Sequence, residues 1–210
     1  AITVLLGPGT IYYLRRLKFG QQVRSDGPRT HLKKAGTPSM GGVLILAALA
    51  AAVVLTSSMS RSVSVALVAA LGCGVIGLLD DALKIVAKRS LGLRAREKLA
   101  GQAGIALLIA LFAWKQGEGS SLIIPFVGTE AQLHPVVFVL FNVLVMVAAS
   151  NAVNITDGLD GLAAGSTAIA ALAFAILAWR GGSSDMAIFF AAVAGACLGF
   201  TWFNAHPAQV

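Results

Sequence analysis

Charged residues are scarce in this sequence. Asp, Glu, Lys and Arg together make up 12% of its 210 residues, whereas soluble domains carry roughly 25%. Hydrophobic residues make up 57% of the chain, and its mean hydropathy is +0.83. This composition excludes an ordinary soluble domain and predicts a protein that resides in a lipid bilayer.

Cysteine is also rare, and several common sequence signals are missing. The two cysteines, Cys73 and Cys197, each lie inside an apolar run without metal-ligand spacing. We therefore interpret both as small buried hydrophobes, and no disulfide framework follows. The chain has no initial Met, no signal-peptide pattern, no internal repeat and no coiled-coil heptad. We expect a single integral-membrane domain over residues 1–210 that is incomplete at both ends.

Long uncharged runs dominate the rest of the sequence. Runs of about twenty apolar residues match a hydrocarbon core of about 30 Å, so they predict an all-α, polytopic membrane helical bundle. Residues 1–14 are uncharged but too short to span, and they predict the end of one more helix. The connector at 117–132 predicts a short hairpin. About six complete spans are predicted, at residues 35–60 (with the apolar centre 43–55), 62–79, 99–114, 135–153, 162–179 and 186–203.

The basic residues indicate how the bundle is oriented. If the spans alternate, thirteen of the sixteen Lys and Arg residues fall on one side, and Arg61, Lys115 and Arg180 fall on the other. The positive-inside rule makes the first side cytoplasmic and the hairpin extracytoplasmic. The net charge of +7 is thus explained by orientation and by contact with anionic membrane lipids, and no nucleic acid is expected.

Polar residues gather on the cytoplasmic side, at the end of the fourth span. The segment 151–162 contains the amides Asn151 and Asn154 and the carboxylates Asp157 and Asp160. Carboxylates this close to hydrocarbon are costly unless they lie at a water-filled mouth with partners. The glycines of the segment allow the backbone to approach a ligand closely. A structural loop needs fewer polar groups, so we interpret the segment as a binding site for a metal or a nucleobase.

Asp80 and Asp81 form a second acidic group at the end of the second span. On a helix, Lys84 shares a face with one or both of them, and the two aspartates diverge by about 100°. Neighbouring carboxylates suit Mg²⁺, which prefers oxygen ligands. The alternative is a solvated helix end with an ion pair, and the aspartates at 157 and 160 favour the functional interpretation. We expect Asp81 to pair with Lys84, which would leave Asp80 freer to approach a phosphate.

Other residues on this side are candidates for binding phosphate or a base edge. Each also has a structural interpretation, as a cytoplasmic anchor, a snorkelling side chain or a helix terminus before proline. The glycine-to-lysine order near Lys34 differs from that of a Walker A loop. These candidates are His31, Lys33, Lys34, Lys98, Asn204 and His206.

Four motifs occur in the order that is typical of one known family. With them, the chain resembles the bacterial phospho-N-acetylmuramoyl-pentapeptide transferases, within the polyprenyl-phosphate N-acetylhexosamine-1-phosphate transferase superfamily. By this resemblance, the chain covers the end of the first helix through the seventh helix of a ten-helix architecture. The four motifs are His31-Leu-Lys-Lys-Ala-Gly-Thr-Pro-Ser-Met-Gly-Gly42, Asp80-Asp81-Ala-Leu-Lys84, Asn151-Ala-Val-Asn-Ile-Thr-Asp-Gly-Leu-Asp-Gly-Leu162 and Phe203-Asn-Ala-His-Pro-Ala208.

The resemblance implies a reaction and roles for these residues. The reaction is transfer of phospho-N-acetylmuramoyl-pentapeptide from UDP to undecaprenyl phosphate, which forms lipid I and UMP at the cytoplasmic face of the bacterial inner membrane. Asp80, Asp81 and Asp157 would be catalytic, and Asp80 and Asp157 would hold Mg²⁺ with a further ligand beyond Val210. The residues that the resemblance implies for substrate binding are Lys34, Gly158, Leu159, Asp160 and Asn204. The residue types and positions add His31, Lys33, Lys84, Lys98, Asn151, Asn154 and His206 as substrate-binding candidates.

Two departures and two alternatives accompany this resemblance. Position 39 is Ser where the family usually has Thr, a conservative change. The sequence stops at Val210, before a family segment with a metal-binding aspartate, so we expect this piece alone to be inactive. A sibling enzyme that transfers N-acetylglucosamine-1-phosphate to the same lipid remains an alternative. An ion-coupled transporter, with carboxylates near the bilayer midplane, is a more distant one. A homodimer is left open.

Overall fold

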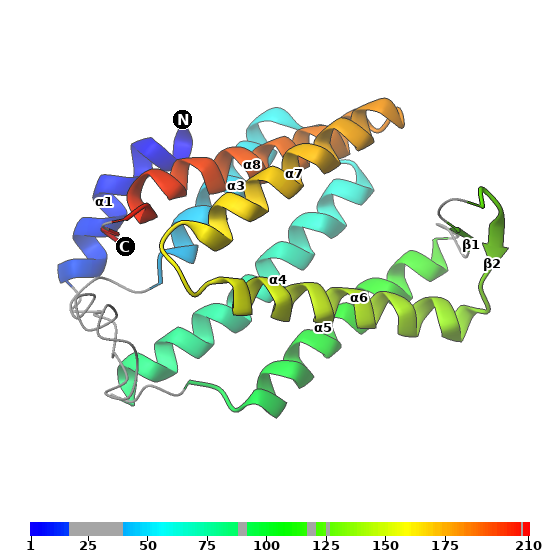
Figure 1. The fold of residues 1–210 in the computed structure, drawn as a ribbon, viewed down its shortest axis with the longest axis horizontal. Helices are drawn as coiled ribbons and strands as arrows, with labels where there is room; N and C mark the ends of the chain where they lie inside the picture. Colours follow the sequence, from blue (N-terminus) through cyan, green and yellow to red (C-terminus); the bar gives the residue numbers. More distant parts are fainter. Residues whose placement is uncertain (17–39, 88–91, 117–120, 125–126, 207) are drawn as a thin grey trace.

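The described residues of the chain form seven helices and one short hairpin (Figure 1). The computed structural model describes residues 1–16, 40–87, 92–116, 121–124, 127–206 and 208–210. The predicted all-α membrane fold is confirmed. The elements are α1 (Ile2–Arg16), α3 (Gly42–Thr56), α4 (Arg61–Val86), α5 (Ala95–Lys115), β1 (Ser121–Ile123), β2 (Glu130–Gln132), α6 (Pro135–Thr156), α7 (Leu162–Arg180) and α8 (Ser184–Asn204).

Five of the helices, α4 to α8, are long and apolar enough to cross a membrane. The chain is therefore a multi-pass membrane protein. The first predicted span is shorter than expected, because α3 has 15 residues, or about 22 Å at 1.5 Å per residue. This length falls short of a hydrocarbon core of about 30 Å. The helix ends at Thr56 because Ser57 takes an extended conformation.

The predicted hairpin is confirmed between α5 and α6. Strands β1 and β2 pair antiparallel, with Ser121 opposite Gln132 and Ile123 opposite Glu130. Figure 1 places this hairpin at the opposite end of the bundle from the starts of α3, α5 and α7. Those starts lie near the C-terminal ends of α1, α4, α6 and α8 (Figure 1). The described parts of the segments predicted to carry the site therefore meet at one end of the molecule, which we call the polar end.

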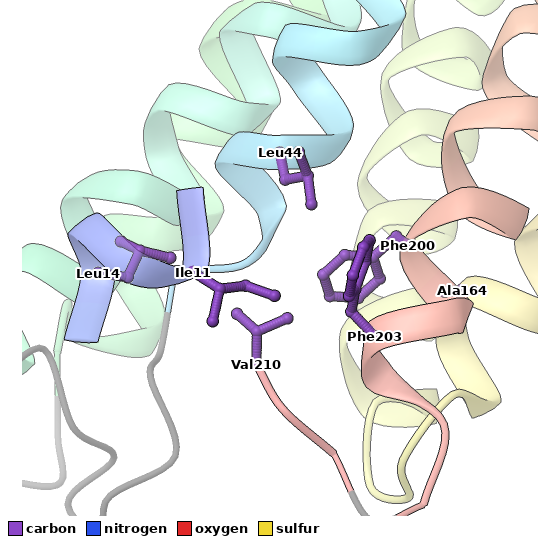
Figure 2. Close-up of a cluster of buried hydrophobic side chains, with 7 residues drawn as sticks. All are labelled: Ile11, Leu14, Leu44, Ala164, Phe200, Phe203 and Val210. Atoms are coloured by element: carbon purple, nitrogen blue, oxygen red, sulfur yellow. The ribbon is translucent and has the colours of Figure 1, made fainter. Parts of the chain in front are cut away.

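Helix α8 is the centre of packing. It contacts α1, α3, α4 and α7, and close approach to α1 depends on Gly199, where a Cβ would lie 2.6 Å from the Cβ of Thr3. Small residues commonly permit such contacts between membrane helices. Figure 2 shows the buried cluster at the polar end of this contact. Its members are Ile11, Leu14, Leu44, Ala164, Phe200, Phe203 and Val210.

Candidate active site

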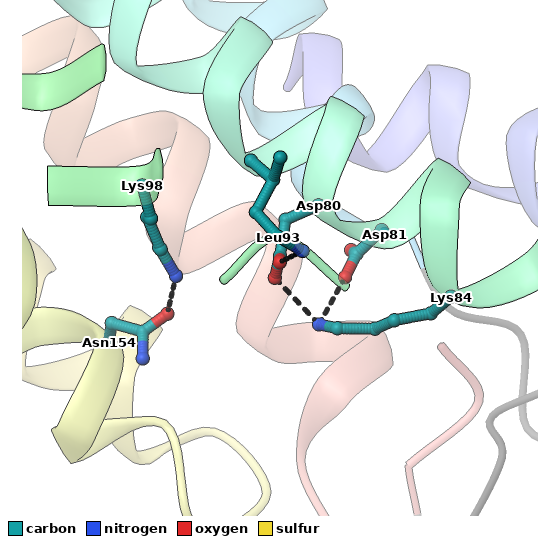
Figure 3. Close-up of polar contacts among 6 residues, drawn as sticks. All are labelled: Asp80, Asp81, Lys84, Leu93, Lys98 and Asn154. Carbon is teal, nitrogen blue, oxygen red and sulfur yellow. Dashed lines mark hydrogen bonds and ion pairs between the residues drawn. The ribbon is translucent and has the colours of Figure 1, made fainter. Parts of the chain in front are cut away.

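Asp80 is a buried residue on α4, with 9% of its surface exposed. Helix α4 continues to Val86, so Asp80 lies within a regular helix instead of at its end. Its Oδ1 accepts a hydrogen bond from the backbone N–H of Leu93 at 2.8 Å (Figure 3). A Cβ at Gly92 would collide with Oδ1 and the backbone oxygen of Asp80. Glycine therefore allows the segment before α5 to close over this carboxylate.

Lys84 pairs with both aspartates. Its Nζ lies 2.8 Å from Asp80 Oδ2 and 2.9 Å from Asp81 Oδ1. The side chain of Asp80 is 13% exposed and that of Asp81 is 33% exposed. The expected pair between Asp81 and Lys84 is present, but the expectation that it leaves Asp80 freer is wrong. An ammonium has three donors, and from positions i+3 and i+4 it reaches both carboxylates. The exposed fractions of the two side chains make Asp81 the more accessible one.

Lys98 links this acidic group to α6. Its Nζ donates to Asn154 Oδ1 at 2.7 Å, and its charge also acts on the Asp80 carboxylate. Figure 3 shows the Lys98–Asn154 pair beside Asp80, Asp81 and Lys84. Helices α4, α5 and α6 therefore contribute neighbouring charges and amides to one site. The spacing of the motifs along the sequence could not reveal this arrangement.

A second contact between α5 and α6 lies one helical turn away. Gln102, which is 4% exposed, donates to Ser150 Oγ at 2.9 Å and accepts from Asn151 Nδ2 at 2.8 Å. Asn151 was assigned a role from the sequence, whereas Gln102 was assigned none. The sequence did contain one indication of Gln102, namely an amide side chain within an apolar run. Such a side chain is rarely buried without a hydrogen-bond partner.

The connection between α6 and α7 is tied to the end of α8. Gly161 has φ +76°, a conformation that favours glycine, and its N–H donates to Asn204 Oδ1 at 2.9 Å. Asn204 Nδ2 donates in turn to the backbone oxygen of Val210 at 2.6 Å. The amide of Asn204 thus binds backbone on both sides. It fixes the position of the loop that holds Asp157, Gly158, Leu159 and Asp160.

The carboxylates of this loop differ in their surroundings. Asp160 Oδ2 lies 3.3 Å from His206 Nδ1, and the histidine side chain is 88% exposed whereas that of Asp160 is 9% exposed. Asp157 follows the last turn of α6, where its N–H donates to Val153 O. Gly158 and Leu159 are exposed to solvent. His31, Lys33 and Lys34 lie outside the described residues.

The donor set fits a hard cation in part. Asp80, Asp81 and Asp157 supply the carboxylate oxygens that Mg²⁺ prefers, and Lys84 sits between the first two. Within the described ranges, no group of three or more His, Cys, Asp and Glu side chains is close enough to hold a metal ion. A metal on these carboxylates would therefore need ligands from water, substrate or other parts of the protein.

Comparison with known proteins gives consistent matches. The profile of Glycosyl transferase family 4 matches residues 62–210, and Phospho-N-acetylmuramoyl-pentapeptide-transferase signature 1 matches residues 34–46. A protein named phospho-N-acetylmuramoyl-pentapeptide-transferase from Desulforamulus reducens is 49% identical over the whole chain, which covers 64% of that relative. Proteins of the same name from Anoxybacillus flavithermus and Bacillus licheniformis are 48% and 49% identical, and the chain spans 65% of each.

Proposed function

The chain belongs to glycosyl transferase family 4, and on that membership we propose that the natural protein transfers phospho-N-acetylmuramoyl-pentapeptide from UDP to undecaprenyl phosphate. The products are lipid I and UMP. The observation that carries this proposal is identity of 47–49% along the whole chain to relatives with the corresponding name. The signature at residues 34–46 favours this substrate over UDP-N-acetylglucosamine.

The geometry of the polar end suits phosphoryl transfer. This chemistry depends mainly on alignment and on neutralisation of phosphate charge. Lys84 and Lys98 lie beside the carboxylates, and each can donate to phosphate oxygens. Mg²⁺, bound through Asp80 and Asp157, would supply further neutralisation of the diphosphate. Asp81, the more accessible of the pair, helps to orient the lipid phosphate.

The loop between α6 and α7 binds the nucleotide in this proposal. Asn204 holds the loop through Gly161, so that the backbone of Gly158 and Leu159 and the carboxylate of Asp160 form one edge of the site. Asn151 and Asn154 border it from the last turns of α6. His31, Lys33, Lys34 and His206 contribute positive charge or donors for the diphosphate.

The polar end faces the cytoplasm of the bacterial inner membrane in this proposal. Thirteen of the sixteen Lys and Arg residues belong to segments on that side, which is the distribution expected for the cytoplasmic face. This orientation gives the soluble nucleotide access from the cytoplasm, while the lipid enters between helices. An ion-coupled transporter is disfavoured because the carboxylates gather at one end of the bundle and not at its middle.

The test is release of UMP by the purified natural full-length protein with undecaprenyl phosphate and Mg²⁺. We expect turnover with UDP-N-acetylmuramoyl-pentapeptide and none with UDP-N-acetylglucosamine. Turnover restricted to UDP-N-acetylglucosamine would instead support the sibling activity. Absence of UMP release with both nucleotides, from protein that remains folded in detergent, would refute the proposal.

A further inference from the structure

Gln102 is an amide buried two turns inside an apolar membrane helix. Only 4% of its surface is exposed, and a buried amide is costly unless it is hydrogen-bonded. Both ends of the side chain are bonded to α6: Nε2 donates to Ser150, and Oε1 accepts from Asn151. Gln102 therefore contacts the start of the Asn151–Leu162 segment without belonging to any of the four motifs.

The orientation of the Asn151 amide follows from what its partners are able to do. Asn151 Nδ2 donates to the backbone oxygen of Val147 at 2.8 Å, and a carbonyl oxygen is only an acceptor. The second hydrogen on Nδ2 goes to Gln102 Oε1 at 2.8 Å. Both hydrogens are thus used within the protein, and Oδ1 is left as the group with which Asn151 can bind a substrate.

Asn154, one turn further along α6, is bonded through its amide oxygen, whereas Asn151 is bonded through its amide nitrogen. Its Oδ1 accepts from Lys98 Nζ at 2.7 Å, and an ammonium is only a donor. The Nδ2 hydrogens of Asn154 therefore remain to donate. Two residues of α5, four positions apart, thus fix the amides on α6 so that Asn151 offers an acceptor and Asn154 offers a donor.

We propose that Gln102 is a positioning residue for the transfer reaction, which orients Asn151 so that its Oδ1 faces the substrate as an acceptor. This inference rests on the proposed function, because Asn151 acts on the UDP-sugar. Gln102 does not touch the substrate. Its removal should weaken nucleotide binding more than it slows the chemical step, since the Asn151 amide would then be held by the Val147 carbonyl alone.

Three substitutions in the natural full-length protein separate this role from simple packing. Gln102→Leu removes both hydrogen bonds and keeps an apolar side chain of similar size. Gln102→Glu restores acceptors for Asn151 Nδ2 and for the Ser150 hydroxyl. Asn142→Leu is the matched control, because Asn142 is a half-buried amide on α6 that also donates to the i−4 carbonyl, at 2.9 Å to Phe138 O. Unlike Asn151, Asn142 lies outside the four motifs and outside the polar end.

The readouts are KM and kcat for UMP release, and the Kd for UMP measured without turnover. Gln102→Leu should raise KM and the Kd about tenfold, the effect expected when an orienting hydrogen-bond partner is lost, while kcat changes less than about threefold. Gln102→Glu should recover most of this loss, and Asn142→Leu should match the natural protein in all three values.

Two patterns would overturn the positioning role. One is wild-type KM and Kd in Gln102→Leu, and the other is an equal defect in Asn142→Leu, which would indicate general damage to α6. Failure of the proposed function has a different signature. If the natural protein binds UMP but releases none from the UDP-sugar, the transfer reaction is refuted, whereas the Kd values of the variants still decide the role of Gln102.

Discussion

Helices α8 and α6 are both apolar enough to cross a membrane, but they are held in the molecule by different interactions. In the most apolar 18-residue stretch of α8, 39% of the residues are buried within the described chain, whereas the corresponding share in α6 is 6%. Helix α8 is fixed by large apolar side chains and close contacts with α1 and α3. Helix α6 buries Val139, and side-chain hydrogen bonds from Lys98 and Gln102 join it to α5.

This difference separates the parts of the molecule that supply stability from those that supply chemistry. In lipid, apolar surface gives little drive for helix association, so packing and polar contacts decide which helices stay together. The α8 region is held by apolar packing, and the α5–α6 contact adds to its packing polar groups that also face the site. A single hydrogen bond between membrane helices contributes little stability. We therefore expect substitutions near α8 to affect folding, and substitutions of polar side chains between α4, α5 and α6 to affect mainly turnover.

The largest effect is expected for the aspartate pair. Asp80→Asn should reduce the rate of UMP release about a thousandfold, because a preorganised carboxylate is removed from the site. Asp81→Asn should cost about tenfold, because Asp81 is more exposed and Lys84 retains Asp80 as a partner. Rates are measured at saturating lipid, nucleotide and Mg²⁺. Equal losses in the two variants would contradict this ranking, and a dead Asp81→Asn enzyme would reverse it.

The packed region should respond through stability. Leu44→Ala creates a cavity beside Phe200 in the cluster of Figure 2, where Leu44 is 1% exposed, and should destabilise the protein by about 2 kcal/mol or more. The matched control is Leu144→Ala on α6, since Leu144 is 65% exposed. Thermal unfolding in one detergent compares the two. Similar melting temperatures for both variants would remove the contrast between α8 and α6.

Asn204 joins the two regions, and its substitution should have an intermediate effect. Asn204→Ala removes the bonds to Gly161 N and Val210 O, so the loop loses its anchor and the Kd for UMP should rise about tenfold. Asn204→Asp keeps the acceptor for Gly161 but not the donor, and we expect a smaller rise. An Asn204→Asp variant that is weaker than Asn204→Ala would show that the Gly161 bond is not the important one.

The smallest functional effect is expected for a cysteine at position 127, one of two positions that test the orientation in the membrane. In a cysteine-free background, Val127→Cys in the hairpin and Leu159→Cys in the site loop replace residues that are 66% and 65% exposed. A membrane-impermeant thiol reagent should label position 127 from the extracytoplasmic side and position 159 from the cytoplasmic side. Labelling of Val127→Cys from the cytoplasm would refute the orientation, and turnover of Val127→Cys should stay near that of the natural protein.

Much of the fold could be predicted from the sequence because uncharged apolar runs of about twenty residues are typical of membrane-spanning helices. The boundaries were less predictable. Asp80, Asp81 and Lys84 mark the end of an apolar run, but the helix itself continues to Val86, and Lys84 pairs with both aspartates there. Helix α3 is shorter than its uncharged run because Ser57 leaves the helical conformation.

The location of the site at one end of the molecule could be predicted, but the hydrogen-bond and ion-pair partners of its residues could not. Motifs identified Asp80, Asn154 and Asn204 as candidates, and Lys98 was a candidate because of its position where a basic loop enters an apolar run. Their contacts depend on side chains far apart in sequence, such as Asn204 and the N–H of Gly161, and spacing carries no information about such pairs. Gln102 was not recognised because one amide within an apolar run has no pattern, and only its contacts with Ser150 and Asn151 identify it.

The most direct test of the contrast between the two regions is one paired measurement on Lys98→Met in the natural full-length protein. Lys98 binds Asn154 and acts on Asp80, and Met preserves most of its apolar stem. We expect the rate of UMP release to fall about a hundredfold while the melting temperature changes by less than about 3 °C. A large fall in melting temperature with turnover retained would contradict the assignment of chemistry to the α4–α6 region and of stability to α8.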